Sequence, residues 1–278
     1  MRIIDKRMTA KAGDTITLYG LFDCHVDSKE CDLKALKRDI AAIAADPNAY
    51  AILGGDFNDM IFHGDPRYAP GDLLKEIATQ RSPADAVIAY NLAILEPIKD
   101  KILVYMAGNH ELDFDKRHHT NVARRTADAL GVPYGSYCCF LSLFFNGNGA
   151  GHGLRVDGYL HHGSNGGPVT GGSIKQTRRL GDYDFNFSMT GHIHTADGKR
   201  KVRLKRVGQF GNGRIRHEAV AMASCATYKK NYMLDPDGES GWSEQREHAP
   251  SVIGGSRVIL QFNSDEGNAL KCDCWQMA

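Results

Sequence analysis

The sequence predicts an α/β fold, in which helices cover a β-sheet. Residues 15–22 form an apolar, β-branched run that is typical of a buried strand. Residues 28–45 place apolar side chains at helical spacing, and residues 49–53 form a second strand-like run. Strand, helix and strand in this order make up the unit of a sheet covered by helices. With 278 residues, of which 42% are hydrophobic, the chain can bury a sizeable core.

The chain continues to alternate helical and strand-like segments up to about residue 195. The patterns predict helices near residues 73–80, 84–96 and 121–130, and strands at 102–106, 137–145, 154–160 and 184–190. Turn-forming residues at 62–71 predict a loop, and the glycine-rich residues 163–172 predict another loop before a short helix.

Beyond residue 195 the pattern changes. Basic and apolar residues alternate at 199–206, which predicts a solvated edge strand. Apolar segments follow near residues 219–223 and 258–262. Because no repeat or linker divides the chain, we expect a single domain of residues 1–278, with a core at about 15–195 and further strands and an extension at about 196–278.

The composition favours a globular protein without a strong overall charge. There are 34 Lys and Arg against 33 Asp and Glu, so a nucleic acid or an acidic membrane would have to bind a local patch. The N-terminus lacks the apolar core of a signal peptide, and no run approaches the ~18 apolar residues of a membrane span. We therefore expect a soluble, cytoplasmic protein that has no membrane partner.

The seven cysteines do not form a recognisable framework. The pairs Cys138-Cys139 and Cys272-x-Cys274 lack the second half of a zinc-ribbon pattern. We interpret the cysteines as reduced structural thiols.

Strand-like runs repeatedly lead into turns that carry Asp, Asn or His, often beside a glycine. These turns are Asp23-Cys-His25, Gly55-Asp56-Phe-Asn-Asp59, Gly108-Asn109-His110-Glu111, His161-His162-Gly163 and Gly191-His192-Ile-His194. Loops at strand ends are where an open α/β sheet builds its site, so residues far apart in the sequence can meet there. Carboxylate, amide and imidazole groups together suit Mn, Fe, Zn or Ni.

In this order the turns resemble the calcineurin-like metallophosphoesterase superfamily, whose pattern is D-x-H, G-D-x-x-D, G-N-H-E or G-N-H-D, H, and G-H-x-H. The resemblance covers residues 15–195. It implies two packed mixed β-sheets flanked by helices, in four layers, with the site at the sheet ends. It also implies two transition-metal ions, with Mn as the first choice and Fe, Zn or Ni as alternatives.

The resemblance implies a ligand set for each ion. One ion would be held by Asp23, His25, Asp56 and His194, and the other by Asp56, Asn109, His192 and one of His161 or His162. Asp56 would bridge the two ions. A shared carboxylate keeps two cations ~3.5–4 Å apart and offsets their repulsion.

The resemblance further implies a hydrolase that cleaves phosphate esters, diesters above all, with a metal-bound hydroxide. His110 would face the substrate as an imidazolium that stabilises or protonates the leaving oxygen, and Asp59 would orient His110. An imidazole is the natural proton donor near neutral pH. The substrate would be a phosphate ester, with nucleotides and nucleic acids among the candidates.

The choice between His161 and His162 is open in the motif, because both family spellings of this block fit the sequence. Side chains alternate along a strand, so only one of two neighbours can face the site. We favour His162. Cys24, which lies between two predicted ligands, should by the same reasoning point into the core.

Other polar residues have simpler interpretations as turns or solvated surface. The glycine-rich stretch at 163–172 lacks the Gly-Lys-Ser/Thr of a P-loop. Loop residues that could reach a substrate, but that we expect to be solvated, are His63, Arg67, Tyr68, His118 and His119. The basic residues at 199–206 could alternatively track a phosphate backbone. Asp27 departs from the family pattern, in which many members have Gly, and adds a carboxylate near the predicted metals.

Two alternative functions compete with a small-substrate phosphoesterase. The first is a nuclease of the DNA-repair exonuclease type, for which the basic residues at 199–206 are the only support. The second is a metal-binding scaffold that works through protein contacts without catalysis. The presence of Asp59, Asn109 and His110 argues against the scaffold.

Overall fold

The computed structural model describes residues 1–11, 13–68, 71–145, 154–164, 182–230, 252–263 and 269–276, and the single residues 232, 244 and 250. Within this part of the chain, no helix is long and apolar enough to cross a membrane. The expected loop at 165–172, the short helix after it, and the thiols of Cys272 and Cys274 lie outside what is described.

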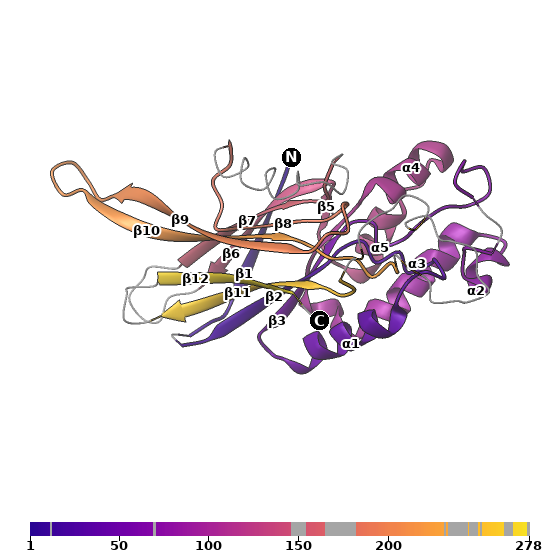
Figure 1. Ribbon diagram of the computed structural model, residues 1–278, viewed down its shortest axis with the longest axis horizontal. Helices are drawn as coiled ribbons and strands as arrows, with labels where there is room; N and C mark the ends of the chain where they lie inside the picture. The colour runs from indigo at the N-terminus through magenta and orange to yellow at the C-terminus, as the bar shows by residue number, and fades with distance from the viewer. Residues whose placement is uncertain are drawn as a thin grey trace.

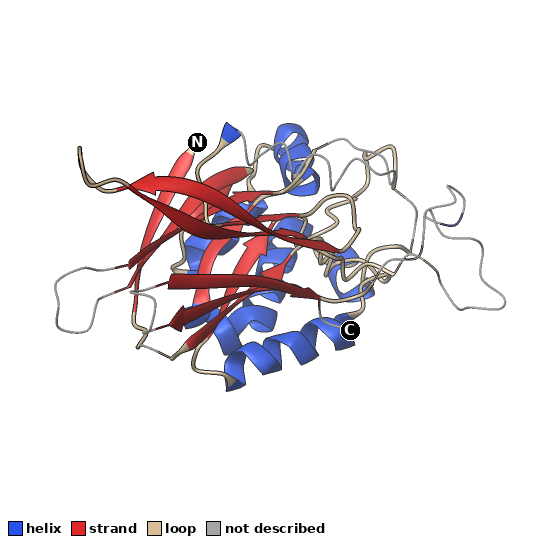
Figure 2. Ribbon diagram, turned by 60° about the vertical axis from the view of Figure 1, so that its left-hand side comes forward, coloured by secondary structure: helices blue, strands red, loops and turns tan. Residues whose placement is uncertain are grey.

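The strands form two six-stranded mixed sheets. The first sheet has the order β1 (Arg2–Met8), β6 (Cys138–Phe145), β7 (Leu154–His161), β8 (Phe187–Thr190), β10 (Arg214–Ser224) and β9 (Asp197–Val207). The second has the order β12 (Ala269–Gln276), β11 (Ser256–Asn263), β2 (Thr15–Leu21), β3 (Ala49–Gly54), β4 (Ile102–Met106) and β5 (Tyr134–Ser136). Strands β2 to β5 run parallel, whereas β11 is antiparallel to β2 and β12. Figure 2 shows the two layers of strands facing each other.

The sheets pack face to face through one apolar core. Because side chains alternate along a strand, Ile16 and Leu18 of β2 point into this core, where they join Leu141 of β6. Tyr19 and Leu21 of β2 lie in a different cluster, with the helices. The predicted fold class, two packed mixed sheets flanked by helices, is confirmed.

Helices α1, α3 and α5 cover the outer face of the second sheet, and Figure 1 shows all the labelled helices gathered toward one end of the molecule. The helices are α1 (Leu33–Ala45), α2 (Lys75–Ala78), α3 (Pro83–Leu95), α4 (Asn109–His118) and α5 (Val122–Leu130), with a 3₁₀ helix η1 (Glu96–Lys101). Leu36 of α1, Leu95 of α3 and Ala123 of α5 are buried in one cluster with Leu53 of β3. The described part of the first sheet's outer face carries an aromatic cluster that includes Tyr159.

The first helix begins later than the sequence predicted. It starts at Leu33 rather than near residue 28, because Ser28 and Cys31 are held in β-bridges to other segments. The Asp32 carboxylate caps the helix by accepting a hydrogen bond from the Ala35 amide at 3.0 Å.

Other segments were missed or misjudged in length. Strand β8 begins at Phe187 rather than residue 184, and β10 begins at Arg214, well before the apolar residues 219–223. Strands β1, β5 and β12 and helix α4 were not predicted. Strand β1 pairs in parallel with β6, from which it is separated by most of the first half of the chain. The strand expected at 199–206 is confirmed as an edge, since β9 is the last strand of its sheet.

The five cysteines that the structure describes with side chains are free thiols. Cys24 is completely buried among the apolar side chains under the helices, as expected for a residue that points away from the site.

Candidate metal centre

The loops that follow β2, β3, β4, β7 and β8 meet at one place. Parallel strands present their carboxyl ends at the same edge of a sheet, which brings the first three loops together. The Asp23 amide donates to the Gly55 carbonyl at 3.1 Å, and the Gly191 amide donates to the His162 carbonyl at 2.8 Å. The five turns singled out in the sequence therefore converge, although they are spread over more than half of the chain.

One group of potential ligands consists of Asp23, His25 and His194, whose donor atoms all lie within 4.8 Å of one another. Asp23 and His25 are buried, and His194 is partly exposed. The His194 Nε2 lies 3.5 Å from Asp23 Oδ1. This group matches the ligand set expected for one ion, apart from the bridging Asp56.

A second group consists of Asp56, His162 and His192, again with donor atoms within 4.8 Å of one another. The His162 Nε2 lies 3.2 Å from Asp56 Oδ2. Asn109 stands between the two imidazoles, with its Oδ1 3.1 Å from His162 Nε2 and 2.8 Å from His192 Nδ1. These are the residues expected around the second ion. The groups are adjacent, since His162 Nε2 is also 4.0 Å from Asp23 Oδ1.

His161 and His162 have different hydrogen-bond partners. The His162 Nδ1 lies 3.0 Å from the Gly54 carbonyl, so its N–H can donate there and leave Nε2 for the site. The His161 Nδ1 instead accepts from the Gly163 amide at 2.8 Å, and Tyr137 packs against both imidazole rings. A metal-binding histidine usually donates its other N–H to a carbonyl or carboxylate, and His162 has this arrangement.

The predicted catalytic residues lie beside these groups. The His110 Nδ1 is 2.6 Å from the backbone carbonyl of Asp59 and 3.4 Å from its carboxylate. The Asp59 carboxylate is closer to His25, at 2.8 Å, and to Lys229, at 3.2 Å. Asp59 therefore positions His110 mainly through its main chain. His25, Asp59 and His110 also form a third set of atoms close enough to share an ion.

The backbone of the site is strained at several predicted ligands. Among the residues that the structure describes, eight that are not glycine have positive φ, and five of these are Asp23, His25, Asp56, His192 and His194, with φ between 47° and 74°. Such conformations cost of order 1–3 kcal/mol each and persist where the surrounding structure holds them in place. Strained backbone of this kind clusters at functional sites, and here it is concentrated at the predicted ligands.

Two motif glycines allow close approach between loops. A Cβ on Gly108 would come within 2.0 Å of Asp56 Oδ1, and a Cβ on Gly191 would come within 2.4 Å of Asp23 Oδ2. The same carboxylates accept backbone hydrogen bonds from the neighbouring loops, from the His110 amide to Asp56 and from the His192 amide to Asp23, both at 2.9 Å. One oxygen of each carboxylate is thus fixed, while the other faces the site.

Burial and charge set the protonation of the site. Burial would raise the pKa of Asp56, but the imidazoles of His162 and His110 hold it well below its ordinary value. Burial lowers the pKa of His25 to about 4, despite the opposing effect of Asp59. Burial also lowers the pKa of His162, but Asp56 outweighs this and raises it to about 10. A metal ion would displace the proton from His162, as metal ions do when they bind imidazole ligands.

The residues present fit a metal ion. Asp23 Oδ1 and His25 Nε2 are buried and have no hydrogen-bond partner. The other ring nitrogen of His25, Nδ1, lies 2.8 Å from Asp59 Oδ1. An unsatisfied buried polar atom costs about 1–3 kcal/mol. Coordination to a cation would satisfy Asp23 and His25 together, and the mixture of carboxylate, imidazole and amide suits a transition metal.

Sequence reasoning gave no role to Glu111, although this residue closes the third motif. Its buried carboxylate accepts from the amides of Asp56, Asn58 and Gly108 at 2.9–3.1 Å, which ties the second motif to the third. Burial, followed by the charge of Asp56, raises the pKa of Glu111 to about 8. The signal was in the motif itself, since a carboxylate three residues after a glycine N-cap can reach back to free amides.

Asp27 has a different role from the one suggested by the sequence. Its carboxylate accepts from the amides of Asp59, at 2.5 Å, and Met60, at 2.9 Å, and it belongs to none of the ligand groups. Burial and the nearby Asp59 raise its pKa to about 6. Asp27 therefore shapes the loop that holds Asp59 and does not extend the ligand set.

Two basic side chains, Lys229 and Arg67, also lie near the site, and the sequence assigned neither of them to it. Lys229, which follows β10, pairs with Asp59 and, at 3.3 Å, with Glu30. Arg67 is exposed, as expected, but its Nη1 also lies 3.5 Å from His110 Nε2, while Asp65 holds the rest of the guanidinium in a two-point contact. No motif signals either residue, because they reach the site through loop geometry.

The remaining loop histidines agree with the expectation of solvation. His63, His118 and His119 are exposed, and Tyr68 is partly exposed beside the His63 ring. His118 packs on Phe114 of its own helix.

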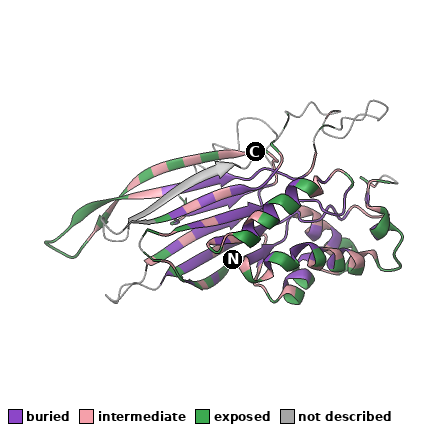
Figure 3. Ribbon diagram, turned by 90° about the horizontal axis from the view of Figure 1, so that it is seen from below, coloured by how far each residue is buried: buried purple, intermediate pink, exposed green. Residues whose placement is uncertain are grey.

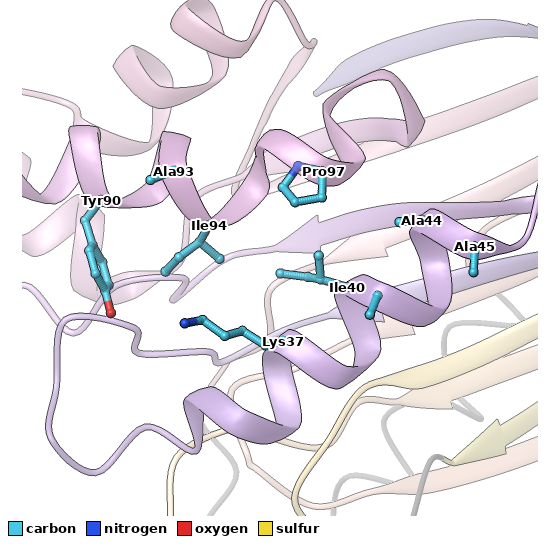
Figure 4. Close-up of a pocket in the computed structure, with 9 residues that line it drawn as sticks. Lys37, Ile40, Ala44, Ala45, Tyr90, Ala93, Ile94 and Pro97 are labelled. Atoms are coloured by element: carbon cyan, nitrogen blue, oxygen red, sulfur yellow. The ribbon is translucent and has the colours of Figure 1, made fainter.

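An apolar groove lies elsewhere on the molecule, between α1 and the segment formed by α3 and η1 (Figure 4). It is lined by Lys37, Ile40, Ala41, Ala44, Ala45, Tyr90, Ala93, Ile94 and Pro97. Because only Lys37 and Tyr90 among these residues carry polar side chains, the groove lacks the groups needed to hold a metal ion. Among the described residues, the groups that could hold a metal ion lie in the loops at the strand ends.

Comparison of the chain with models of known protein families and with curated proteins found no match. Seventeen chains of solved structure match it. One of them is a single mutant of Vps29 from Entamoeba histolytica, at 11% sequence identity and a TM-score of 0.38, with 95% of this chain and 100% of that chain covered.

Proposed function

We propose that this protein is a metal-dependent hydrolase of phosphate esters, of the calcineurin-like metallophosphoesterase type, which holds two Mn²⁺ or similar ions. The observation that carries the proposal is the meeting of two ligand groups at one site, Asp23, His25 and His194 beside Asp56, His162 and His192. Asn109 contacts two imidazoles of the second group. The strained backbone at five of these residues supports a functional role.

The metal ions and the residues that hold them would have different roles in hydrolysis. Cations at this site supply Lewis acidity, which makes water a nucleophile near neutral pH and neutralises charge on the phosphoryl oxygens. Asp56 belongs to the second group, and in this proposal its carboxylate would also serve the first ion. The Gly54 carbonyl lies 3.0 Å from His162 Nδ1, and this contact fixes the orientation of the His162 ring.

His110 is the proton donor in this proposal. The Asp59 carbonyl holds the proton on Nδ1, so that Nε2 faces the open side of the site beside Arg67. When Nε2 is protonated as well, the ring is an imidazolium that can pass the Nε2 proton to the leaving oxygen. The side chain is 13% exposed, which leaves it accessible to a substrate while its orientation is fixed.

A phosphodiester fits the charges around His110. Among the described residues, Arg67 is the only Lys or Arg within hydrogen-bonding distance of His110. A diester phosphate carries one negative charge near neutral pH, and a single guanidinium can pair with one of its oxygens. This favours a diester over a monoester, whose phosphate carries more charge.

We expect protein stripped with EDTA and reloaded with Mn²⁺ to bind about two ions per chain and to hydrolyse bis-p-nitrophenyl phosphate faster than p-nitrophenyl phosphate. Elemental analysis and the release of p-nitrophenolate measure the two quantities. A matched pair of variants sharpens the test. His162→Ala should lose metal and activity, whereas His161→Ala should keep both. Equal metal loss in the two variants, or no metal uptake by the native chain, would contradict the proposal.

We expect Arg67→Ala to raise KM for bis-p-nitrophenyl phosphate and to lower kcat/KM by about 10–100-fold, because a charge-assisted hydrogen bond contributes roughly 1.5–3 kcal/mol. Arg117→Ala is the matched control, since Arg117 also pairs with Asp65 but shows no contact with His110. Steady-state kinetics on both variants measure kcat and KM for this substrate. If the two variants lose activity equally, Arg67 acts through the Asp65 loop and not on the substrate.

A metal-binding scaffold without catalysis is the alternative from another class. The fixed orientation of His110, 3.9 Å from Asp56 Oδ2, favours an enzyme, because a scaffold needs no proton donor beside its ions. Metal uptake by the native chain without hydrolysis of either ester would favour the scaffold.

A further inference from the structure

Strands β9 and β10 form a basic ribbon that extends away from the site. In Figure 1 this hairpin projects past the other strands, at the end opposite the helices, and Figure 3 shows its outer part as exposed. Residues 197–218 contain eight Lys and Arg against two Asp and Glu, a net charge of +6. The whole chain carries only +1, so the remainder is acidic by −5.

The charges are arranged in a row on one face of the ribbon. Lys199, Lys201, Arg203 and Lys205 occupy alternate positions of β9 and therefore point the same way. Lys199 and Lys201 lie opposite the buried Met222 and Val220, which belong to the aromatic cluster on the outer face of the first sheet. The basic row thus faces outward, away from the second sheet.

The opposite face of the ribbon carries exposed apolar side chains where it projects, alternating on β9 with Arg200 and Arg206. Val202, Leu204 and Ile215 are each more than half exposed there. Farther along β10, Ala221 and Ala223 lie on this same face of the ribbon and point into the core between the sheets. The two faces therefore differ in character, and a partner that binds through charge would approach the outer one.

The carboxylates that the structure describes pair with only some of the basic residues on this face. Glu218 and Asp184 pair with Arg203, and both lie 3.8–3.9 Å from Lys205. Within the described part of the chain, Lys201 and Arg214 have no carboxylate partner. Charge on an edge strand can also prevent pairing between copies, and this would apply both to β9 and to the stretch of β10 before Ala221, which among the described strands pairs only with β9.

We propose that the β9–β10 ribbon binds the phosphate backbone of a nucleic acid. Its eleven-residue strands span roughly 36 Å, about one turn of B-form DNA. The cations recur roughly every 6.6 Å along the face, so a rod-shaped polyanion can contact several of them at once. A two-stranded ribbon also fits the major groove.

The position of the ribbon relative to the site supports this partner. Strand β9 begins three residues after His194, and the segment after β10 returns to the site, where the Thr227 hydroxyl donates to the Asp23 carbonyl at 2.8 Å. A backbone held along the ribbon would therefore lead toward the proposed metal centre. Hydrolysis of that backbone rests on the proposed function, whereas binding to the ribbon does not.

The test is fluorescence anisotropy of a labelled 20-base-pair DNA duplex in EDTA, so that failure of the hydrolase proposal does not affect it. We expect the native protein to bind with Kd on the order of 10⁻⁶ M at low salt. The triple variant Lys201→Gln, Lys205→Gln and Arg214→Gln should bind about 10-fold or more weakly. The slope of log K against log salt should also become shallower by about 2–3, since each phosphate contact contributes about 0.9.

The matched control removes the same charge elsewhere, with Lys11→Gln, Lys34→Gln and Lys75→Gln, all at exposed positions. It should bind within about twofold of the native protein, and circular dichroism should show that both triple variants are folded. A labelled single strand and an RNA duplex test related backbones, and binding of either supports the proposal. Equal losses in the two triple variants, no binding to any nucleic acid, or binding only to phosphatidylserine vesicles would overturn it.

Discussion

His110→Ala should lower kcat by about 10²–10⁴-fold on an alkyl phosphodiester while leaving the metal content nearly unchanged. The loss should be much smaller on bis-p-nitrophenyl phosphate. An alkoxide needs a proton in the transition state because its conjugate acid has a high pKa, whereas p-nitrophenolate leaves well unaided. The dependence of the loss on the leaving group is therefore the signature of a general acid.

The structure explains why His110 is separable from metal binding. Its backbone amide holds Asp56 Oδ1, an interaction that alanine retains. Its ring contacts the Asp59 carbonyl through Nδ1 and approaches Arg67 through Nε2, and it lies outside the two groups proposed to hold the ions. Removal of the ring thus leaves the ligands and their backbone connections in place.

His118→Ala is the matched control, because His118 is exposed on the same helix and faces no ligand group. Kinetics on the two esters and elemental analysis should show no change for this variant. Loss of metal in His110→Ala would instead make His110 a ligand, as the third group with His25 and Asp59 would allow. An equal loss on both esters would reduce its role to electrostatic stabilisation of the phosphoryl group.

The central elements of the fold could be predicted because their sequence patterns are local. Strands β2, β3 and β4 are continuous apolar runs, as expected for strands covered on both faces. Strand β1 shows why others were missed. Only Ile4 and Met8 of this edge strand are buried, and its parallel pairing with β6 depends on contacts that no local pattern records. Helix α4 was missed because the motif residues at its start suggest a turn.

The candidate site was predictable to the extent that it depends on residue type and order. Asp23, Asp56 and Asn109 stand at strand ends, where polar side chains are conspicuous after apolar runs. Arg67 and Lys229 reach the same place from irregular segments, and their position depends on ion pairs with Asp65, Asp59 and Glu30. Such contacts arise from loop conformation, which hydrophobic periodicity does not encode.

Asp56→Asn should have the largest effect on metal binding of any single replacement at the site. Asp56 Oδ1 is fixed by the His110 amide, and Oδ2 lies 3.2 Å from His162 Nε2, so the free oxygen is directed at the ligand groups. An amide of the same shape can keep the backbone contact, but it cannot supply the negative charge that offsets repulsion between two cations. The variant should therefore remain folded while it loses its affinity for at least one ion.

The comparison with His194→Ala distinguishes a bridging carboxylate from a terminal ligand. His194 belongs to one ligand group only, so its loss should weaken one ion and leave the other. Replacement of a residue that only hydrogen-bonds to a metal ligand lowers metal affinity by about 10–100-fold. Replacement of a bridging ligand should lower the affinity for both ions by more than this. Elemental analysis across a Mn²⁺ titration, with melting curves in EDTA to confirm folding, measures the difference. If Asp56→Asn keeps both ions and near-native activity while His194→Ala loses one, Asp56 does not bridge the centre.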